Sequence, residues 1–175
     1  MALVLGVDPG FSGALAWYNT VTLRLVAVVP MPITTNSSVF TTETRPQVDG
    51  VGLARLLRES HPTIAVVEQV NASPKMGVVS AFRFGEGFGV LQGVLDTLGV
   101  KTVHAFPSAW KSALGLSRDK RESVQMACNL WPEFNNTFSR GKASGDLAEA
   151  ALLAYYGRKL VPPDQRVKVI VPLKP

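Results

Sequence analysis

The chain has 175 residues, 46% of them hydrophobic, which is enough to bury one substantial core and short for two ordinary domains of about 100–200 residues each. An excess of 18 Lys and Arg over 13 Asp and Glu gives a formal charge of +5 and a pI near 9.6, which suits a polyanionic partner such as nucleic acid but also an ordinary solvated basic surface. The single cysteine, Cys128, excludes an internal disulfide and a cysteine-built metal site within one chain. Without a signal-peptide core or an uncharged run of ~18 residues, the sequence predicts a soluble, cytoplasmic protein with no membrane contact.

The first thirty residues predict three short strands joined by tight turns, at Leu3–Val7, Gly13–Tyr18 and Leu23–Val29. Consecutive strands with tight links imply an antiparallel meander. From Thr34 to Pro46 the chain is rich in Thr, Ser and Asn and has no apolar periodicity, so we predict a mobile loop there.

Strands and helices alternate in the rest of the chain. Asp49 is the predicted N-cap of a helix that ends at His61-Pro62, and the continuously apolar strand Thr63–Val67 follows, expected to lie parallel to the first strand. The remaining predicted elements are a helix at Val78–Leu98, a strand at Lys101–Ala105, and helices at Pro107–Leu114, Asp119–Leu130 and Asp146–Arg158. Three antiparallel strands followed by βαβ units predict an α/β protein with a mixed sheet, in one domain over residues 1–160, with residues 161–175 as a tail or an added edge strand.

Two apolar strands end directly in a carboxylate. Asp8 follows the first strand and precedes Pro9-Gly10, so it is either a turn residue or a functional group at the strand end. Glu68 ends the strand Thr63–Val67 in the same way. A charge is costly to bury unless it is paired or binds a cation, and two neighbouring carboxylates repel each other without one. The pair therefore argues for a metal ion more strongly than either residue does alone.

Asp146 and Glu149 are three residues apart at the start of the last helix, so they share one face near its N-terminus. One interpretation is helix capping, with Asp146 as the cap and Glu149 at the third helical position. The other is a functional site, because apolar residues wrap most of the helix and would pack its acidic end onto the sheet; these are Leu147, Ala150, Ala151 and Ala154.

Together the four carboxylates offer an all-oxygen site suited to Mg²⁺ or Mn²⁺. Two such ions about 3.5–4 Å apart would suit hydrolysis of a phosphodiester, one activating the attacking water and the other stabilising the departing 3′-oxygen. Cleavage that leaves a 5′-phosphate is the implied chemistry. Ser12, although close to Asp8, is interpreted as a turn residue rather than a nucleophile.

Three acidic segments, in this order and spacing, resemble the motifs of RuvC-type Holliday-junction resolvases: Gly6-Val7-Asp8-Pro9-Gly10-Phe11-Ser12-Gly13-Ala14, Val67-Glu68-Gln69-Val70 and Gly145-Asp146-Leu147-Ala148-Glu149-Ala150. The similarity extends through Phe106–Lys111 and Arg118–Arg121 and covers roughly residues 3–157. It implies an RNase H-like fold, a five-stranded mixed sheet of order 3-2-1-4-5 flanked by helices, and a homodimer. The implied activity is Mg²⁺-dependent paired nicking of a four-way junction, with Asp8, Glu68, Asp146 and Glu149 as metal ligands and catalytic residues.

Two residues depart from the family pattern. Glu149 stands where bacterial RuvC commonly has Asp, and Asn71 stands where it has a junction-opening aromatic residue. The second departure leaves open a broader branched-DNA nuclease that also cuts flaps and three-way junctions. The long segment Thr34–Pro46 indicates a phage or organelle member rather than the bacterial housekeeping enzyme.

Basic residues cluster near the acidic motifs, and each is either a contact to DNA phosphates or a solvated surface residue: Lys75, Lys111, Arg118, Lys120, Arg121, Arg140 and Lys142. Phe82, Phe84 and Phe88 lie at helical spacing and predict a dimer interface rather than base stacking. An alternative from another class is an ATP-binding protein of the actin and sugar-kinase type, because Asp8-Pro9-Gly10 with Ser12-Gly13 resembles its first phosphate loop. The length of the chain counts against that alternative, since such proteins need two lobes.

Overall fold

The computed structural model describes residues 2–37, 44–71, 76–139, 141 and 143–162. Five strands form the central sheet in the order β3-β2-β1-β6-β7; they are β1 (Leu3–Asp8), β2 (Ala14–Asn19), β3 (Arg24–Pro30), β6 (Ile64–Glu68) and β7 (Lys101–Ala105). The first three are antiparallel, whereas β6 lies parallel to β1 and β7 parallel to β6. Since β6 and β7 are the fourth and fifth strands of this sheet, the predicted mixed sheet and its order are confirmed.

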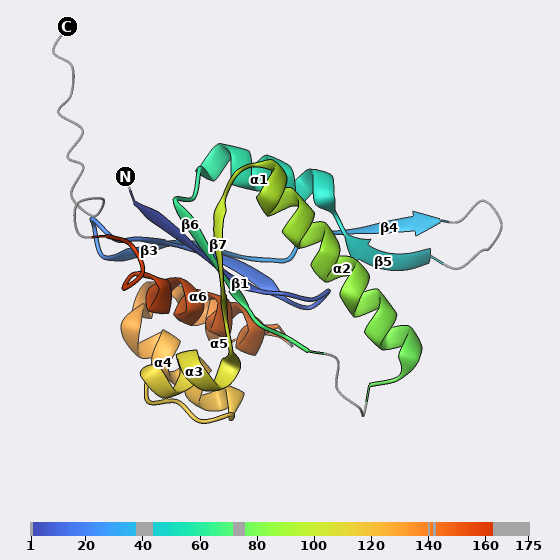
Figure 1. The fold of residues 1–175 in the computed structure, drawn as a ribbon. Coiled ribbons are helices and arrows are strands. Elements are labelled where there is room, and N and C mark those ends of the chain that lie inside the picture. Colours follow the sequence, from blue (N-terminus) through green and yellow to red (C-terminus); the bar gives the residue numbers. More distant parts are fainter. Residues whose placement is uncertain (1, 38–43, 72–75, 140, 142, 163–175) are drawn as a thin grey trace, which may run out of the picture.

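Helices cover both faces of the sheet (Figure 1). One face carries α1 (Gly50–Ser60) and α2 (Val78–Thr97), and the other carries α6 (Ser144–Gly157) with the shorter helices. These are α3 (Pro107–Ala113), α4 (Lys120–Leu130) and α5 (Asn135–Ser139), with a 3₁₀ turn at Pro132–Phe134.

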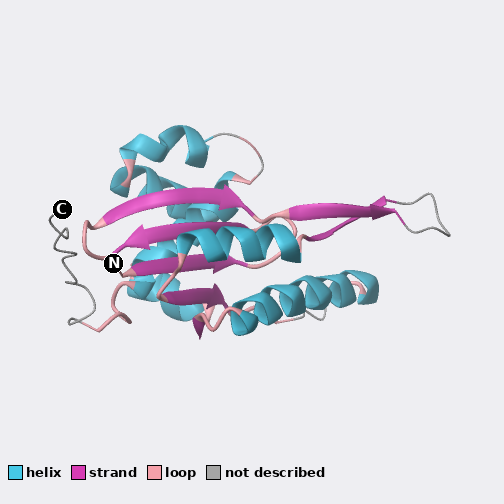
Figure 2. Cartoon of the chain, turned by 90° about the horizontal axis from the view of Figure 1, so that it is seen from above, coloured by secondary structure: helices cyan, strands magenta, loops and turns pink. Residues whose placement is uncertain are grey.

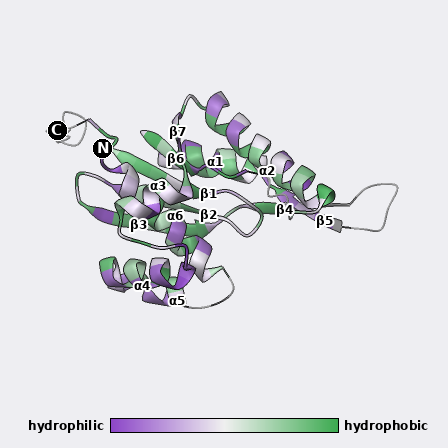
Figure 3. Ribbon diagram, turned by 60° about the horizontal axis from the view of Figure 1, so that its bottom comes forward, coloured by the Kyte–Doolittle hydropathy of each residue, from purple (hydrophilic) through white to green (hydrophobic). Residues whose placement is uncertain are grey.

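Side chains of the central strands alternate between two apolar cores. Leu5 and Val7 of β1 belong to the core under α1 and α2, while Val4 belongs to the core under α6. Figure 3 shows most of the sheet in green, the hydrophobic end of its scale. Burial on both faces explains why the sequences of β1 and β6 are continuously apolar rather than alternating.

The helix α6 lies unusually close to β1, and Gly6 permits this. A Cβ at Gly6 would lie 2.1 Å from the backbone oxygen of Ala150 and 2.3 Å from the backbone nitrogen of Ala154. No side chain fits in that space, so residue 6 must be glycine for α6 to pack against β1. The close approach brings the N-terminal turns of α6 to the end of β1.

Thr34–Pro46 is the segment predicted as a mobile loop, and its described residues, 34–37 and 44–46, lie instead in a second sheet. Strands β4 (Ile33–Ser37) and β5 (Thr44–Val48) pair antiparallel and extend beyond the end of the central sheet (Figure 2). The prediction of a loop was wrong because it required apolar alternation, which marks strands with one buried face. Threonine has a high strand propensity, and a ribbon that projects from the body needs no apolar face.

The boundaries of the predicted helices agree with the structure with one exception, but α5 and the 3₁₀ turn lie where the sequence indicated a polar loop through Ser144. Asp49 caps α1 by accepting hydrogen bonds from the backbone N–H groups of Val51 and Gly52, and His61 ends it in the left-handed conformation. The last helix, however, begins at Ser144 rather than Asp146. Among the residues described, no helix is both long and apolar enough to cross a bilayer. The segment predicted as a tail or edge strand, residues 161–175, lies outside the described residues from position 163 onward.

Candidate metal centre

Asp8 and Glu68 leave the sheet side by side. Val7 is paired with Val67 in the parallel ladder between β1 and β6, so the next residue on each strand, a carboxylate in both cases, emerges at the same edge. Both residues are buried, with 8% and 9% of their surface exposed. The turn after Asp8 is tight, since a Cβ at Gly13 would lie 2.1 Å from the backbone oxygen of Asp8. The predicted juxtaposition of two strand-end carboxylates is therefore present.

The helix α6 brings two further carboxylates to this edge. Asp8, Asp146 and Glu149 each place a carboxylate oxygen within 4.8 Å of the others. The capping interpretation of Asp146 is wrong, because the cap position is Ala143 and no side chain caps the helix. Asp146 is the third helical residue, and its carboxylate contacts Lys120.

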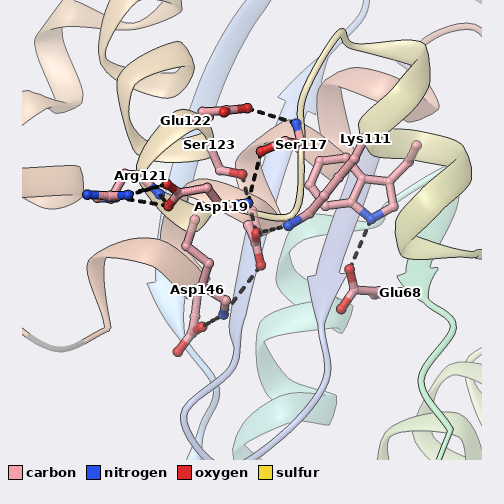
Figure 4. A network of polar contacts seen from close by, with 11 residues as sticks. Glu68, Lys111, Ser117, Asp119, Arg121, Glu122, Ser123 and Asp146 are labelled. Atoms are coloured by element: carbon pink, nitrogen blue, oxygen red, sulfur yellow. Dashed lines mark hydrogen bonds and ion pairs between the residues drawn. The ribbon is translucent and has the colours of Figure 1, made fainter.

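Two lysines lie within the acidic cluster (Figure 4). The Lys111 ammonium donates to Oε1 of Glu149 at 2.5 Å, and the hydroxyl of Ser123 donates to the same oxygen at 3.2 Å. Lys120 pairs with Asp146 and lies 3.3 Å from Oε2 of Glu149. The Lys111 side chain is only 10% exposed, whereas that of Lys120 is 53% exposed. Lys111 is thus an internal counter-ion, and Lys120 approaches the cluster from solvent.

Glu68 has a different partner. The indole N–H of the fully buried Trp110 donates to its Oε1 at 3.0 Å. Burial raises the pKa of Glu68, while this hydrogen bond acts to lower it. Burial and the neighbouring Glu68 carboxylate raise the pKa of Asp8 to about 8. In the absence of a cation Asp8 therefore holds a proton at neutral pH.

The residues present fit a hard divalent cation. All the acidic groups would bind a metal through carboxylate oxygens, and hard cations such as Mg²⁺ and Mn²⁺ prefer oxygen ligands. Two ammonium groups face four carboxylates, so the cluster keeps an excess of negative charge once all of them ionise. Asp8, Asp146 and Glu149 could hold an ion together, with Glu68 beside Asp8.

The predicted DNA contacts occupy different environments. Lys111 is buried and paired with Glu149, so its ammonium is not available as a surface contact to phosphate while that pair is made. Lys120 is turned toward the carboxylates, and the exposed Arg121 is paired with Asp119. Arg118 is exposed and lines, with Lys111, a cavity of about 430 Å³ beside α3. The other three candidates, Lys75, Arg140 and Lys142, lie outside the described residues.

Sequence reasoning did not assign Trp110 or Ser123 to the site. Trp110 lies in the segment Phe106–Lys111, which carries part of the family resemblance, and this position was a signal. Nothing in the sequence indicated its hydrogen bond to Glu68. Ser123 offered no signal, because a serine on an amphipathic helix is ordinary. Ser123 is fully buried, and only the packing of α4 against α6 shows that its hydroxyl meets Glu149.

Comparison with solved structures finds the same fold in Holliday junction resolvases. Thermus thermophilus RuvC in complex with a Holliday junction substrate superposes with a TM-score of 0.61 at 17% identity, covering 91% of this chain and 96% of that one. The yeast mitochondrial resolvase has a TM-score of 0.54 at 18% identity, covering 90% and 78%. The fowlpox virus resolvase has a TM-score of 0.53 at 14% identity, covering 91% and 99%.

No protein-family model and no curated protein sequence matches the chain. The structural likeness at these identities establishes the fold, which is that of RuvC-type resolvases.

Proposed function

We propose that this protein is a metal-dependent, structure-selective endodeoxyribonuclease that resolves four-way DNA junctions by paired symmetric nicks leaving 5′-phosphates. The observation that carries the proposal is the convergence of Asp8, Asp146 and Glu149 within 4.8 Å, beside Glu68, at one edge of a resolvase-type sheet. The neighbours that share this fold are resolvases, and one of them was solved with a Holliday junction.

Asp8, Glu68, Asp146 and Glu149 would hold Mg²⁺ or Mn²⁺, two ions in the full complement, which would activate water and stabilise the departing 3′-oxygen. Lys111 and Ser123 fix Oε1 of Glu149, while Oε2 lies 3.3 Å from the Lys120 ammonium. Lys120, on the solvent side, balances the carboxylates before DNA arrives and lies where a phosphate would meet the site. These contacts hold the site in place before substrate binds, which is a major source of catalytic power.

Basic residues would bind the DNA backbone, and a second copy of the chain would supply the second active site. Arg118 and Arg121 are exposed near the acidic centre and would neutralise backbone phosphates of the junction, together with Lys75, Arg140 and Lys142. Two nicks require two sites, so the functional unit would be a homodimer. Exposed apolar residues on the first turns of α2 support an interface there; these are Val78, Val79 and Phe82, which is 76% exposed.

Cleavage of synthetic DNA tests the proposal. The protein is incubated with Mg²⁺ or Mn²⁺ and end-labelled four-way, three-way, flap and linear substrates, next to Asp8→Asn and, as a control, Asp96→Asn on the exposed side of α2. We expect symmetric nicks in the four-way junction by the wild type and Asp96→Asn. Asp8→Asn should bind the junction without cutting it.

Three other outcomes would contradict this proposal in different ways. Normal cutting by Asp8→Asn would refute the site. Equal cutting of flaps and three-way junctions would favour a broader branched-DNA nuclease, in keeping with Asn71 at the position of the family's junction-opening aromatic residue. Hydrolysis of ATP without cutting of any DNA would favour the actin and sugar-kinase alternative.

A further inference from the structure

Two consecutive residues of the short helix α3 hold two different carboxylates of the acidic centre. The indole N–H of Trp110 donates to Oε1 of Glu68 on β6, and the ammonium of Lys111 donates to Oε1 of Glu149 on α6. Glu68 and Glu149 are far apart in the sequence, so α3 is the element that both have in common. The Lys111 ammonium lies 5.3 Å from the centroid of the Trp110 ring, and Figure 4 shows Lys111 and Glu68 with the dashed lines of their hydrogen bonds.

Trp110 is more than a packing residue at this place. It is fully buried, and its only polar atom is directed at an acidic side chain rather than at a backbone carbonyl or solvent. This donor engages Oε1, and among the described residues no hydrogen bond to Oε2 of Glu68 is seen. It also limits rotation of the carboxylate, since the indole cannot move within the close-packed core.

We propose that Trp110 is a positioning residue, which engages Oε1 of Glu68 so that Oε2 is presented to the cation. This inference rests on the proposed function, because it concerns how that same centre binds metal. Partners that orient metal ligands commonly contribute ~10–100-fold to metal affinity. The role is distinct from that of Lys111, because Trp110 is neutral and adds no charge to the cluster.

A second tryptophan offers a matched control. Trp17 is also buried, and its indole N–H also makes one side-chain hydrogen bond, to Oγ of Ser60 at 2.9 Å. It belongs to the apolar core on the other face of the sheet, under α1 and α2. Trp110→Phe and Trp17→Phe therefore remove the same ring area and one indole hydrogen bond each, to a carboxylate in the first case and to a hydroxyl in the second, and only the first touches the acidic centre.

The experiment measures Mn²⁺ affinity by isothermal titration calorimetry in the absence of DNA, together with the urea midpoint of each variant. We expect Trp110→Phe to bind Mn²⁺ about 10-fold more weakly than wild type. Trp17→Phe should bind Mn²⁺ as the wild type does, although both variants lose stability. Wild-type affinity in Trp110→Phe, or equal weakening in both variants, would overturn the inference.

A second measurement on the unmodified protein decides the question if Trp110→Phe fails to fold. The indole N–H resonances are followed by nuclear magnetic resonance during titration with Mg²⁺, and are assigned with Trp17→Phe and Trp131→Phe. The Trp110 resonance should shift and that of Trp17 should stay. A Trp110 resonance that does not respond while Mg²⁺ binds would overturn the inference. If the wild type binds neither Mg²⁺ nor Mn²⁺, the proposed function itself falls, and this inference with it.

Discussion

The replacement of Asp8 by Asn should make the metal-free protein more stable at alkaline pH. Burial and the neighbouring Glu68 carboxylate raise the pKa of Asp8 from 3.8 to about 8 in the folded protein. Between these two values the folded protein holds a proton that the unfolded chain has released. The free energy of unfolding of the wild type therefore falls as the pH rises from about 4 to about 8, and the loss is complete above pH 8.

The size of the effect follows from the shift. At 1.36 kcal/mol for each pKa unit, the shift from 3.8 to about 8 corresponds to an upper limit of ~6 kcal/mol. Asn cannot ionise, so Asp8→Asn avoids this loss. We expect the free energies of unfolding of the two proteins to be similar near pH 4, whereas at pH 9 the variant should be more stable by about 2–5 kcal/mol.

Urea unfolding at intervals from pH 4 to pH 9, in the presence of a chelator, measures this difference. Asp96→Asn serves as the control because Asp96 is exposed on α2, away from the acidic centre. Saturating Mg²⁺ should restore stability to the wild type at pH 9 but not to Asp8→Asn, since a ligand stabilises the state that binds it. Parallel stability curves for wild type and Asp8→Asn across the whole range would refute the reasoning.

Removal of the two lysines of the cluster should have different effects: loss of the Lys111 ammonium should lower stability, whereas loss of the Lys120 ammonium should strengthen metal binding. Lys111→Met leaves the buried Glu149 without its closest counter-ion, so the free energy of unfolding in urea should fall by about 3 kcal/mol in metal-free protein, and an unchanged value would contradict the counter-ion role. Lys120→Met removes a half-exposed ammonium and should cost less than about 1 kcal/mol of stability. The same variant should bind Mn²⁺ about 10-fold more tightly by calorimetry, because an attraction of ~1–4 kcal/mol no longer competes with the cation. Arg118→Met, which removes an exposed charge of the same sign, controls for net charge, and equal tightening in both would contradict direct competition.

The sequence predicted the central sheet because its strands carry a strong local signal. β1 and β6 are apolar runs that end in Asp8 and Glu68, and this pattern alone indicates parallel buried strands with acidic ends. Asp146 and Glu149 were placed on one helix face by their spacing, but their role depended on the resemblance to resolvases. Only the packing of α6 against β1 distinguishes a site from a helix cap.

What the sequence did not predict depends on tertiary contacts. The pairing of Lys111 with Glu149 and of Trp110 with Glu68 joins residues about 40 positions apart, and no local pattern encodes it. A lysine near acidic motifs in a basic protein was therefore interpreted as a DNA contact. The second sheet was missed because, apart from Val48, the side chains that the structure describes in its strands are not buried, and sequence patterns depend on burial.

The second sheet joins the body of the protein where its two strands begin and end, next to α1. The backbone N–H of Asp49, just after β5, donates to the carbonyl oxygen of Pro32, just before β4, at 2.9 Å. This hydrogen bond joins the residue before β4 to the residue after β5, and α1 begins at the next residue, Gly50. Val48, the last residue of β5, is also buried in the core under α1 and α2, so the base of the ribbon is fixed to the body of the protein. A substitution at an exposed strand position such as Thr35 should therefore leave the register of the central sheet and the acidic centre unchanged.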